Sequence, residues 1–252
     1  MNYKMTIQYD GTRYNGWQKQ GNTENTIQGK LETLLSRLSG EPVEVQGAGR
    51  TDAGVHALGQ VANAKFHTDL SKEELRETIN RYLPEDIEVT ELEPVPERFH
   101  SRLNAAEKTY VYRLTVDKRK HVFDRKYLYH YGKNLNLEAM KEAAEYLKGC
   151  HDFQSFCSAR KSKKSTVRVL KEIRLEERDG VLSMTFTGNG FLYHMVRILS
   201  GTLIEVGEQK RKPASMKEIL ESRDRSRAGF LAPAEGLTLV SVLYKKEKEN
   251  DR

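Results

Sequence analysis

Apolar and polar residues alternate near the start of the chain, and this period of two predicts a strand over residues 3–9 with one buried face. Apolar residues then recur every three or four positions over residues 27–38, which predicts an amphipathic helix. Asn25 or Thr26 would cap the start of this helix, and Gly40 would end it. The chain therefore begins as a strand followed by a helix.

The following residues complete a first structural unit. Apolar runs predict three more strands, over residues 42–46, 57–66 and 87–92. Between the last two runs, Ser71-Lys72-Glu73-Glu74 has the pattern of a capping box, so a second helix begins there and ends before Pro84. The resulting order β-α-β-β-α-β is that of a ferredoxin-like unit.

The second half of the chain shows the same order of elements without a repeat of the sequence. It begins with a strand over residues 109–116 and a helix from residue 137 to 147 that Gly149 stops. A hairpin is predicted around the turn Asp179-Gly180. The remaining elements are a helix that ends at Gly207, a short helix with the capping box Ser215-Met216-Lys217-Glu218, and a strand over residues 237–244.

We therefore predict an α+β fold of two ferredoxin-like (RRM-like) units, whose largely antiparallel sheets form a central cleft. Residues 1–103 would form the N-terminal domain, residues 104–245 the C-terminal domain, and residues 246–252 a charged tail. A chain of 252 residues is long enough for two domains. No stretch approaches the roughly 20 apolar residues of a membrane helix, so no membrane partner is expected.

Composition narrows the class of protein. The chain has 42 Lys and Arg against 36 Asp and Glu, a formal charge of +6, which favours polyanionic partners. Its two cysteines, Cys150 and Cys157, form no C-x-x-C pair, so neither a zinc site nor a disulfide framework is expected. We predict a cytoplasmic protein that uses no metal.

The segment Gly47-Ala48-Gly49-Arg50-Thr51-Asp52-Ala53-Gly54-Val55-His56 lies between two predicted strands and combines three glycines with four reactive side chains. A tight turn alone explains the Asp and Gly residues, whereas a polar loop on rigid strands also suits a catalytic group. The glycine spacing fits neither a dinucleotide-binding motif nor a phosphate loop. An ionised Asp52 suits a nucleophile or a general base, while a lone His56 is more often structural.

Basic residues gather between Phe153 and Lys171, where no acidic residue occurs. Candidate contacts to RNA phosphates in this stretch are Arg160, Lys161, Lys163, Lys164 and Arg168. A solvated loop explains the same charges equally well. Elsewhere, Arg197 lies in an apolar helix and needs a carboxylate partner, for which Asp52 is the attractive candidate.

Four segments together resemble one known family. The segment 47–56 strongly resembles the active-site motif of the tRNA pseudouridine synthase A (TruA) family. The other segments resemble its tyrosine strand, its second arginine motif and its C-terminal motif; they are Lys108-Thr109-Tyr110-Val111-Tyr112, Gly190-Phe191-Leu192-Tyr193-His194-Met195-Val196-Arg197 and Ala232-Pro233-Ala234-Glu235-Gly236-Leu237. The resemblance runs in order through essentially the whole chain.

This resemblance implies a role for each of five residues. Asp52 would be the nucleophile, Tyr110 would lie over the target base, and Leu237 would line the base pocket. Arg197 would pair with Asp52, and Arg50 would help to open or hold the RNA. The implied reaction is isomerisation of uridine to pseudouridine at positions 38, 39 and 40 of the tRNA anticodon arm. The family needs no cofactor and works as a homodimer in which each tRNA contacts both subunits.

Two other functions fit parts of the sequence. A non-catalytic RNA-binding protein of two ferredoxin-like units would bind RNA through aromatic strand residues such as Tyr110. A nucleotide-handling enzyme would use the glycine segment for phosphate, although the glycine spacing counts against it. The first alternative predicts that Asp52→Ala keeps all function, whereas an enzyme would bind tRNA and form no pseudouridine.

Overall fold

The structure, a computed structural model, describes residues 1–159 and 165–245 and divides the chain into two compact units. The first unit holds Met1–Lys108 and the segment that begins at Leu239, and the second holds Thr109–Thr238. The architecture is mixed α+β, as predicted, with five α-helices among the described residues. The predicted limits of two independent domains stay a prediction, and the charged tail 246–252 lies outside the described residues.

The first unit is built on strands β1 (Asn2–Tyr9), β3 (His56–Lys65) and β4 (Ile87–Val95), with β1 in the middle. β1 pairs antiparallel with both neighbours. Met5 and Ile7 are fully buried while the residue between them is half-buried, which is the alternation that predicted this strand. The short strand β2 (Val45–Gly47) pairs antiparallel with β3, and β9 (Leu237–Tyr244) also lies next to β3.

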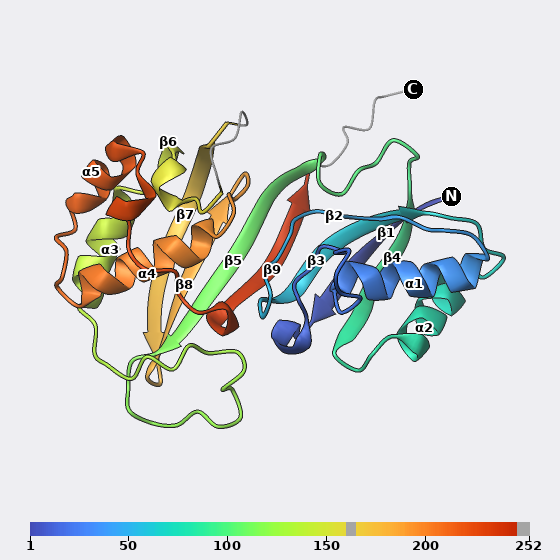
Figure 1. The fold of residues 1–252 in the computed structure, drawn as a ribbon, viewed down its shortest axis with the longest axis horizontal. Helices are drawn as coiled ribbons and strands as arrows, with labels where there is room; N and C mark the ends of the chain where they lie inside the picture. Colours follow the sequence, from blue (N-terminus) through green and yellow to red (C-terminus); the bar gives the residue numbers. More distant parts are fainter. Residues whose placement is uncertain (160–164, 246–252) are drawn as a thin grey trace. The chain divides into compact units, whose positions relative to one another are not determined.

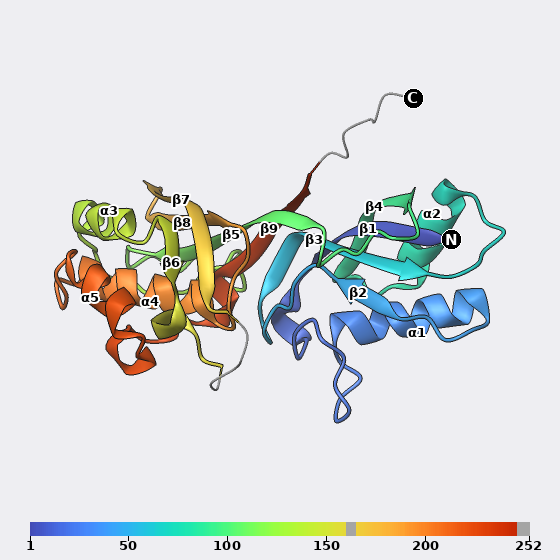
Figure 2. The same ribbon diagram turned by 90° about the horizontal axis from the view of Figure 1, so that it is seen from above.

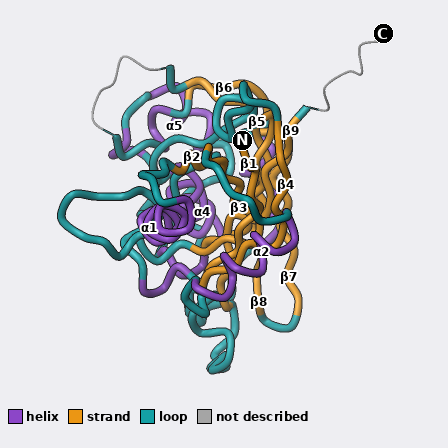
Figure 3. The backbone as a smooth tube through the Cα atoms, turned by 90° about the vertical axis from the view of Figure 1, so that its right-hand side faces the viewer, coloured by secondary structure: helices purple, strands orange, loops and turns teal. Residues whose placement is uncertain are grey.

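Two helices, α1 (Ile27–Ser39) and α2 (Lys72–Tyr82), pack against each other in the first unit (Figure 1). Figure 3 shows α1 nearly end-on. The side chain of Thr26 accepts the Gly29 N–H at 3.2 Å, and Gly40 ends α1 with a φ of 77°. At α2, Ser71 and Glu74 form the predicted reciprocal capping box, and the hydrogen bonds from Ser71 lower the pKa of Glu74.

The second unit holds strands β5 (Ala105–Thr115), β6 (Gly149–Asp152), β7 (Val167–Arg178) and β8 (Val181–Gly188), in the order β5-β8-β7-β6. β7 and β8 form the predicted antiparallel hairpin. Asp179 and Gly180 have positive φ angles of 52° and 77°, as a two-residue type I′ turn requires. The hairpin prediction is therefore confirmed.

Figure 2 shows three helices gathered beside strands β6 to β8: α3 (Leu137–Glu145), α4 (Met195–Gly207) and α5 (Ser215–Ser222). Short 3₁₀ helices cover Gln154–Phe156 (η2) and Arg225–Arg227 (η3). α3 ends at Glu145, earlier than predicted, and Gly149 begins the unpredicted strand β6 with a φ of 100°. Within residues 1–159 and 165–245, no helix combines the length and apolar character needed to cross a bilayer.

The capping box predicted at Ser215 is wrong. Ala214 precedes α5 and makes no side-chain cap, because Ser215 already lies inside the helix. Its hydroxyl donates backward to the Lys212 carbonyl at 2.7 Å. A residue inside the first turn does not have the extended backbone that lets a capping side chain reach forward to the third helical N–H.

Candidate active site

The loop that carries Asp52, residues 48–55 (the Asp52 loop), connects β2 to β3 in the first unit. The strand ladder continues into the loop, because the Ala48 N–H donates to the Val61 carbonyl at 2.7 Å. At its other end, Val55 is buried and its N–H donates to the Asp52 carbonyl at 3.2 Å. Asp52 is half-buried and Arg50 is exposed, so both lie within reach of a ligand.

Two side chains hold the carbonyl groups that precede Arg50. The Lys108 ammonium donates to the Ala48 carbonyl at 2.7 Å, and the Gln60 amide donates to the Gly49 carbonyl at 2.9 Å. Lys108 comes from β5 and Gln60 from β3. Because these strands are far apart in sequence, the conformation of the loop depends on the folded unit and not on turn propensity alone.

Tyr9, at the end of β1, holds the residue next to Asp52. Its hydroxyl is hydrogen-bonded to the Thr51 hydroxyl, with 2.8 Å between the two oxygens. Both residues are buried. Burial raises the pKa of Tyr9 far above its ordinary value, so the phenol stays neutral and keeps its proton for hydrogen bonding.

The segment Tyr14–Trp17 supports the Asp52 loop from a second side. The Trp17 N–H donates to the Thr51 carbonyl at 3.0 Å, and the Gly54 N–H donates to the Tyr14 carbonyl at 3.4 Å. Gly16 has a φ of 90°, and a β-carbon there would come within 2.6 Å of the Thr51 carbonyl oxygen. Only glycine fits this contact, so this segment and the loop are shaped to each other.

His56, the last residue of the predicted motif, is buried at the start of β3. Its Nδ1 accepts the Gly11 N–H at 3.0 Å, and the Asp10 carboxylate lies 3.3 Å from the same nitrogen. Gly11 begins the short 3₁₀ helix η1 (Gly11–Arg13). These contacts support the structural interpretation of His56, because the imidazole ties η1 to β3.

In the second unit, α4 begins directly after His194, whose φ is 64°. Arg197 lies in the first turn of this helix. The Arg197 Nε donates to the Ala232 carbonyl at 2.7 Å. The Ala232 N–H donates back to the Arg197 carbonyl at 3.2 Å. This reciprocal pair of hydrogen bonds fixes the half-buried guanidinium against the C-terminal motif.

The tyrosine strand also contacts both neighbouring motifs within the second unit. Tyr110 packs edge-to-face on Phe191, with 5.0 Å between ring centroids and 79° between the planes. Tyr112 is fully buried and donates from its hydroxyl to the Pro233 carbonyl at 2.9 Å. A β-carbon on Gly236, in the 3₁₀ helix η4 (Ala234–Gly236), would come within 2.7 Å of the Tyr112 ring.

Leu237, which follows η4 and begins β9, is only 6% exposed. The second unit therefore brings together the tyrosine strand, the second arginine motif and the C-terminal motif, whereas Asp52 and Arg50 belong to the first unit. The pairing of Asp52 with Arg197 stays a prediction. The sequence did not predict that Lys108 and Gln60 hold the Asp52 loop. The only signal in the sequence was that Lys108 begins the segment that resembles the tyrosine strand.

The predicted phosphate-binding stretch is described only in part. Arg160, Lys161, Lys163 and Lys164 lie outside the described residues. Arg168, on β7, donates to the carbonyls of Ser165 at 3.0 Å and Val167 at 2.6 Å. Among residues 1–159 and 165–245, no group of three His, Cys, Asp or Glu side chains is arranged to hold a metal ion.

Comparison with known proteins places these motifs in a family. The sequence pattern of the tRNA pseudouridine synthase family matches residues 5–104 and 143–245. A tRNA pseudouridine synthase A of Bacillus sp. strain KSM-64 is 50% identical, over 96% of this chain and 99% of the relative. A tRNA pseudouridine synthase A 2 of Bacillus cereus and a tRNA pseudouridine synthase A 1 of Clostridium tetani are each 46% identical over the same shares. A solved Cbf5-Nop10-Gar1 complex has a TM-score of 0.38 at 12% identity, covering 97% of this chain and 51% of that one, too little to bear on the fold.

The protein is therefore an RNA-modifying isomerase. The chain belongs to the tRNA pseudouridine synthase family. It converts uridine to pseudouridine in tRNA, which decides against the non-catalytic RNA-binding alternative.

Proposed function

We propose that this chain isomerises uridines 38, 39 and 40 of the tRNA anticodon arm, with Asp52 as the nucleophile. The Asp52 loop is the observation that carries the proposal. Its backbone is held by Lys108, Gln60 and Trp17, so the carboxylate is presented on a rigid support. Rigid placement of a reacting group lowers the entropic cost of reaching the transition state.

The chemistry suits a single carboxylate. The bond from C1′ to N1 of uracil breaks, the ring turns, and a bond from C1′ to C5 forms. N1 gains a proton and C5 loses one, so the reaction is balanced without any oxidant or reductant. A carboxylate assists by adding to C6 of the base or to C1′ of the ribose. Both routes begin from an ionised Asp52.

The other site residues complete the proposal. Tyr110 lies over the flipped base, Leu237 lines its pocket, and Arg197 pairs with Asp52 to orient the carboxylate. Arg50, which is exposed, holds the RNA where the uridine has left the stack. Extruding a nucleotide costs a few kcal/mol, which contacts in such a pocket offset. Phosphate contacts from Arg160, Lys161, Lys163, Lys164 and Arg168 would make the affinity depend on salt.

The proposed assembly follows from the same resemblance. Two ferredoxin-like units form a central cleft, two chains form a cytoplasmic homodimer, and each tRNA contacts both subunits. The first unit has the order β1-α1-β2-β3-α2-β4 and the antiparallel pairings that support a ferredoxin-like arrangement. Relatives named tRNA pseudouridine synthase A match this chain at nearly full length, which supports the same substrate here.

The test compares wild type with Asp52→Asn on unmodified tRNA transcripts. Pseudouridine mapping should find the product at positions 38 to 40 with wild type and nowhere with the variant, while both bind tRNA equally. Asp69→Asn is the matched control, because the Asp69 side chain in the same unit is fully exposed. Pseudouridine formation by Asp52→Asn at the wild-type rate, or none at positions 38 to 40 with wild type, would refute the proposal.

A further inference from the structure

The connection from β5 to α3 contains a strongly basic segment, residues 117–130 (the basic loop). Its Lys and Arg residues outnumber its two acidic residues, Asp117 and Asp124, and are Lys118, Arg119, Lys120, Arg125 and Lys126. The proposed reaction gives none of these residues a role. The basic loop lies wholly within the second unit.

The conformation of the basic loop is fixed at both ends. Asp117 forms an ion pair with Arg119, and the His121 imidazole lies 3.3 Å from the same carboxylate. The hydrogen bond from Arg119 lowers the pKa of Asp117, so the pair persists at neutral pH. At the other end, the Thr115 N–H donates to the Tyr129 carbonyl at 2.9 Å. These contacts therefore hold both ends of the basic loop in place.

Apolar side chains of the basic loop are unusually exposed. Phe123 is 95% exposed and the adjacent Val122 is 54% exposed, while Tyr127 is 37% exposed. Single exposed apolar residues are common, but a cluster of them rimmed by polar side chains marks a binding surface. Basic residues interleaved with exposed aromatic rings are typical of surfaces that bind unpaired nucleic acid.

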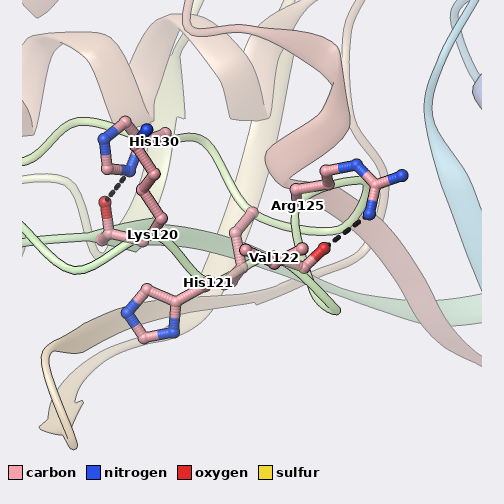
Figure 4. A pocket seen from close by; sticks show the side chains of 7 residues that line it. Lys120, His121, Val122, Arg125 and His130 are labelled. Carbon is pink, nitrogen blue, oxygen red and sulfur yellow. Dashed lines mark hydrogen bonds between the residues drawn. The ribbon is translucent and has the colours of Figure 1, made fainter.

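The basic loop itself forms most of a pocket of about 270 Å³, which is lined by Thr115, Lys120, His121, Val122, Arg125, Leu128 and His130 (Figure 4). Leu128 and Thr115 are both buried, and the surface of the pocket is almost wholly apolar. The His130 imidazole is hydrogen-bonded to the Thr115 hydroxyl at 3.1 Å. Arg125 donates to the Val122 carbonyl at 2.6 Å, which holds its guanidinium beside the pocket.

We propose that the basic loop binds an unstacked nucleotide of tRNA, with the base in this pocket and the phosphates at Lys118 and Lys120. An apolar interior with cationic and imidazole groups around it matches a planar base that carries anionic phosphate. The inference rests on the proposed function, since tRNA is the polyanion that this chain meets. A second copy of the chain fits less well, because two basic loops would repel each other.

The phosphate contacts are tested with Lys118→Gln/Lys120→Gln and unmodified tRNA at several salt concentrations. Each lost contact should reduce the slope of log affinity against log salt by roughly 0.7 to 0.9. Lys217→Gln, the same change at an exposed residue of α5, is the control and should leave the slope unchanged. Equal slopes for wild type and the double variant would overturn the phosphate assignment.

The base pocket is tested by filling it. Val122 lines the pocket and is more than half exposed, so Val122→Trp should fold normally and block the pocket. Its affinity for tRNA should fall about 5- to 150-fold, the loss expected for one stacked base. Phe123→Trp adds bulk at a neighbouring residue outside the pocket lining and should bind nearly as wild type. Equal effects of the two variants would overturn the pocket assignment.

Further measurements separate the sources of the ligand. Excess uridine monophosphate should not displace tRNA from wild type; displacement that Val122→Trp abolishes would assign the pocket to a free nucleotide and overturn the proposal. A changed oligomeric state of Val122→Trp in sedimentation would assign the surface to a second copy instead. If wild type forms no pseudouridine, the proposed function fails; if it does and Val122→Trp binds tRNA normally, this inference alone fails.

Discussion

The indole ring of Trp17 lies so close to Gly47 that a β-carbon on residue 47 would come within 2.5 Å of ring atoms. Trp17 is only 2% exposed, and its backbone N–H holds the Thr51 carbonyl next to Asp52. The first glycine of the motif is therefore required by packing against Trp17 and not by a turn. This contact joins the strand before the Asp52 loop to the segment that supports the loop.

Gly47→Ala should destabilise the chain by about 1–3 kcal/mol, because the added methyl group overpacks a closed contact. We also expect slower pseudouridine formation, since a displaced Trp17 would no longer hold Thr51. Urea unfolding and an activity assay check these effects. Gly21→Ala is the control, because a β-carbon at Gly21 meets no atom within 4 Å. Wild-type stability of Gly47→Ala would contradict the packing argument.

The buried phenol of Tyr9 should make the folded chain less stable at alkaline pH. Burial raises the pKa of Tyr9, so the folded state keeps its proton at a pH where the unfolded state loses it. The contribution of protonated Tyr9 to the free energy of unfolding is complete below about pH 10, the ordinary pKa of tyrosine. This contribution is lost as pH rises further. Wild type should therefore lose free energy of unfolding above pH 10 more steeply than Tyr9→Phe.

The control for this measurement is Tyr82→Phe, which removes a phenol that is 62% exposed. Buried Tyr112 and half-buried Tyr244 also have raised pKa values, so Tyr9→Phe should reduce the alkaline loss without abolishing it. Denaturant titrations between pH 7 and pH 11 provide the comparison. Identical pH profiles for wild type and Tyr9→Phe would show that Tyr9 ionises normally.

Arg197→Lys should lower the rate of pseudouridine formation by roughly 10- to 100-fold, the loss expected for one charged hydrogen bond. A lysine has no Nε–H along its side chain, so it cannot donate to Ala232 and also direct a charge outward. Single-turnover kinetics on tRNA measure the effect. Arg178→Lys, at a side chain that is 92% exposed, should be neutral. An Arg197→Lys enzyme of full activity would exclude a role for the guanidinium geometry.

Ser71→Ala should cost about 0.5–2 kcal/mol, because it removes both the cap of α2 and the partner of Glu74. Ser215→Ala provides an internal comparison with the same sequence pattern, since its hydroxyl makes no forward cap. We expect at most about 0.5 kcal/mol there, the ordinary effect of a surface change. Thermal unfolding of both variants shows whether the sequence pattern of a capping box or the backbone position of the serine determines the stabilisation.

Local patterns predicted the elements whose cause is local. Asp179-Gly180 determines its hairpin because both residues accept positive φ angles, and Ser71 caps α2 because its backbone is extended. The same pattern failed at Ser215, where the preceding chain already turns as a helix. Strand β6 was not predicted, because its four residues begin with a glycine and show no alternation of apolar and polar side chains. They form a strand because they pair with β7.

The sequence predicted which residues belong to the candidate site, but not the contacts that hold them in place. The glycine motif drew attention to Asp52, and the resemblance assigned its role. The anchors of the loop come from Tyr9, Gln60 and Lys108, which no local pattern connects to residue 52. The Ala232 contact of Arg197 likewise joins positions 35 residues apart. Such contacts depend on tertiary packing and need coordinates to be seen.

Strand β9 brings the end of the described chain to the first unit. It lies next to β3, a β-carbon on Gly59 would meet the Val240 carbonyl at 2.4 Å, and the Tyr244 hydroxyl donates to the Ser101 carbonyl at 2.7 Å. During translation, Thr109–Thr238 is complete before this strand leaves the ribosome. The part of the chain made first is therefore finished last, and a fragment that stops after Lys108 leaves uncovered the part of β3 that β9 would pair with beyond β2.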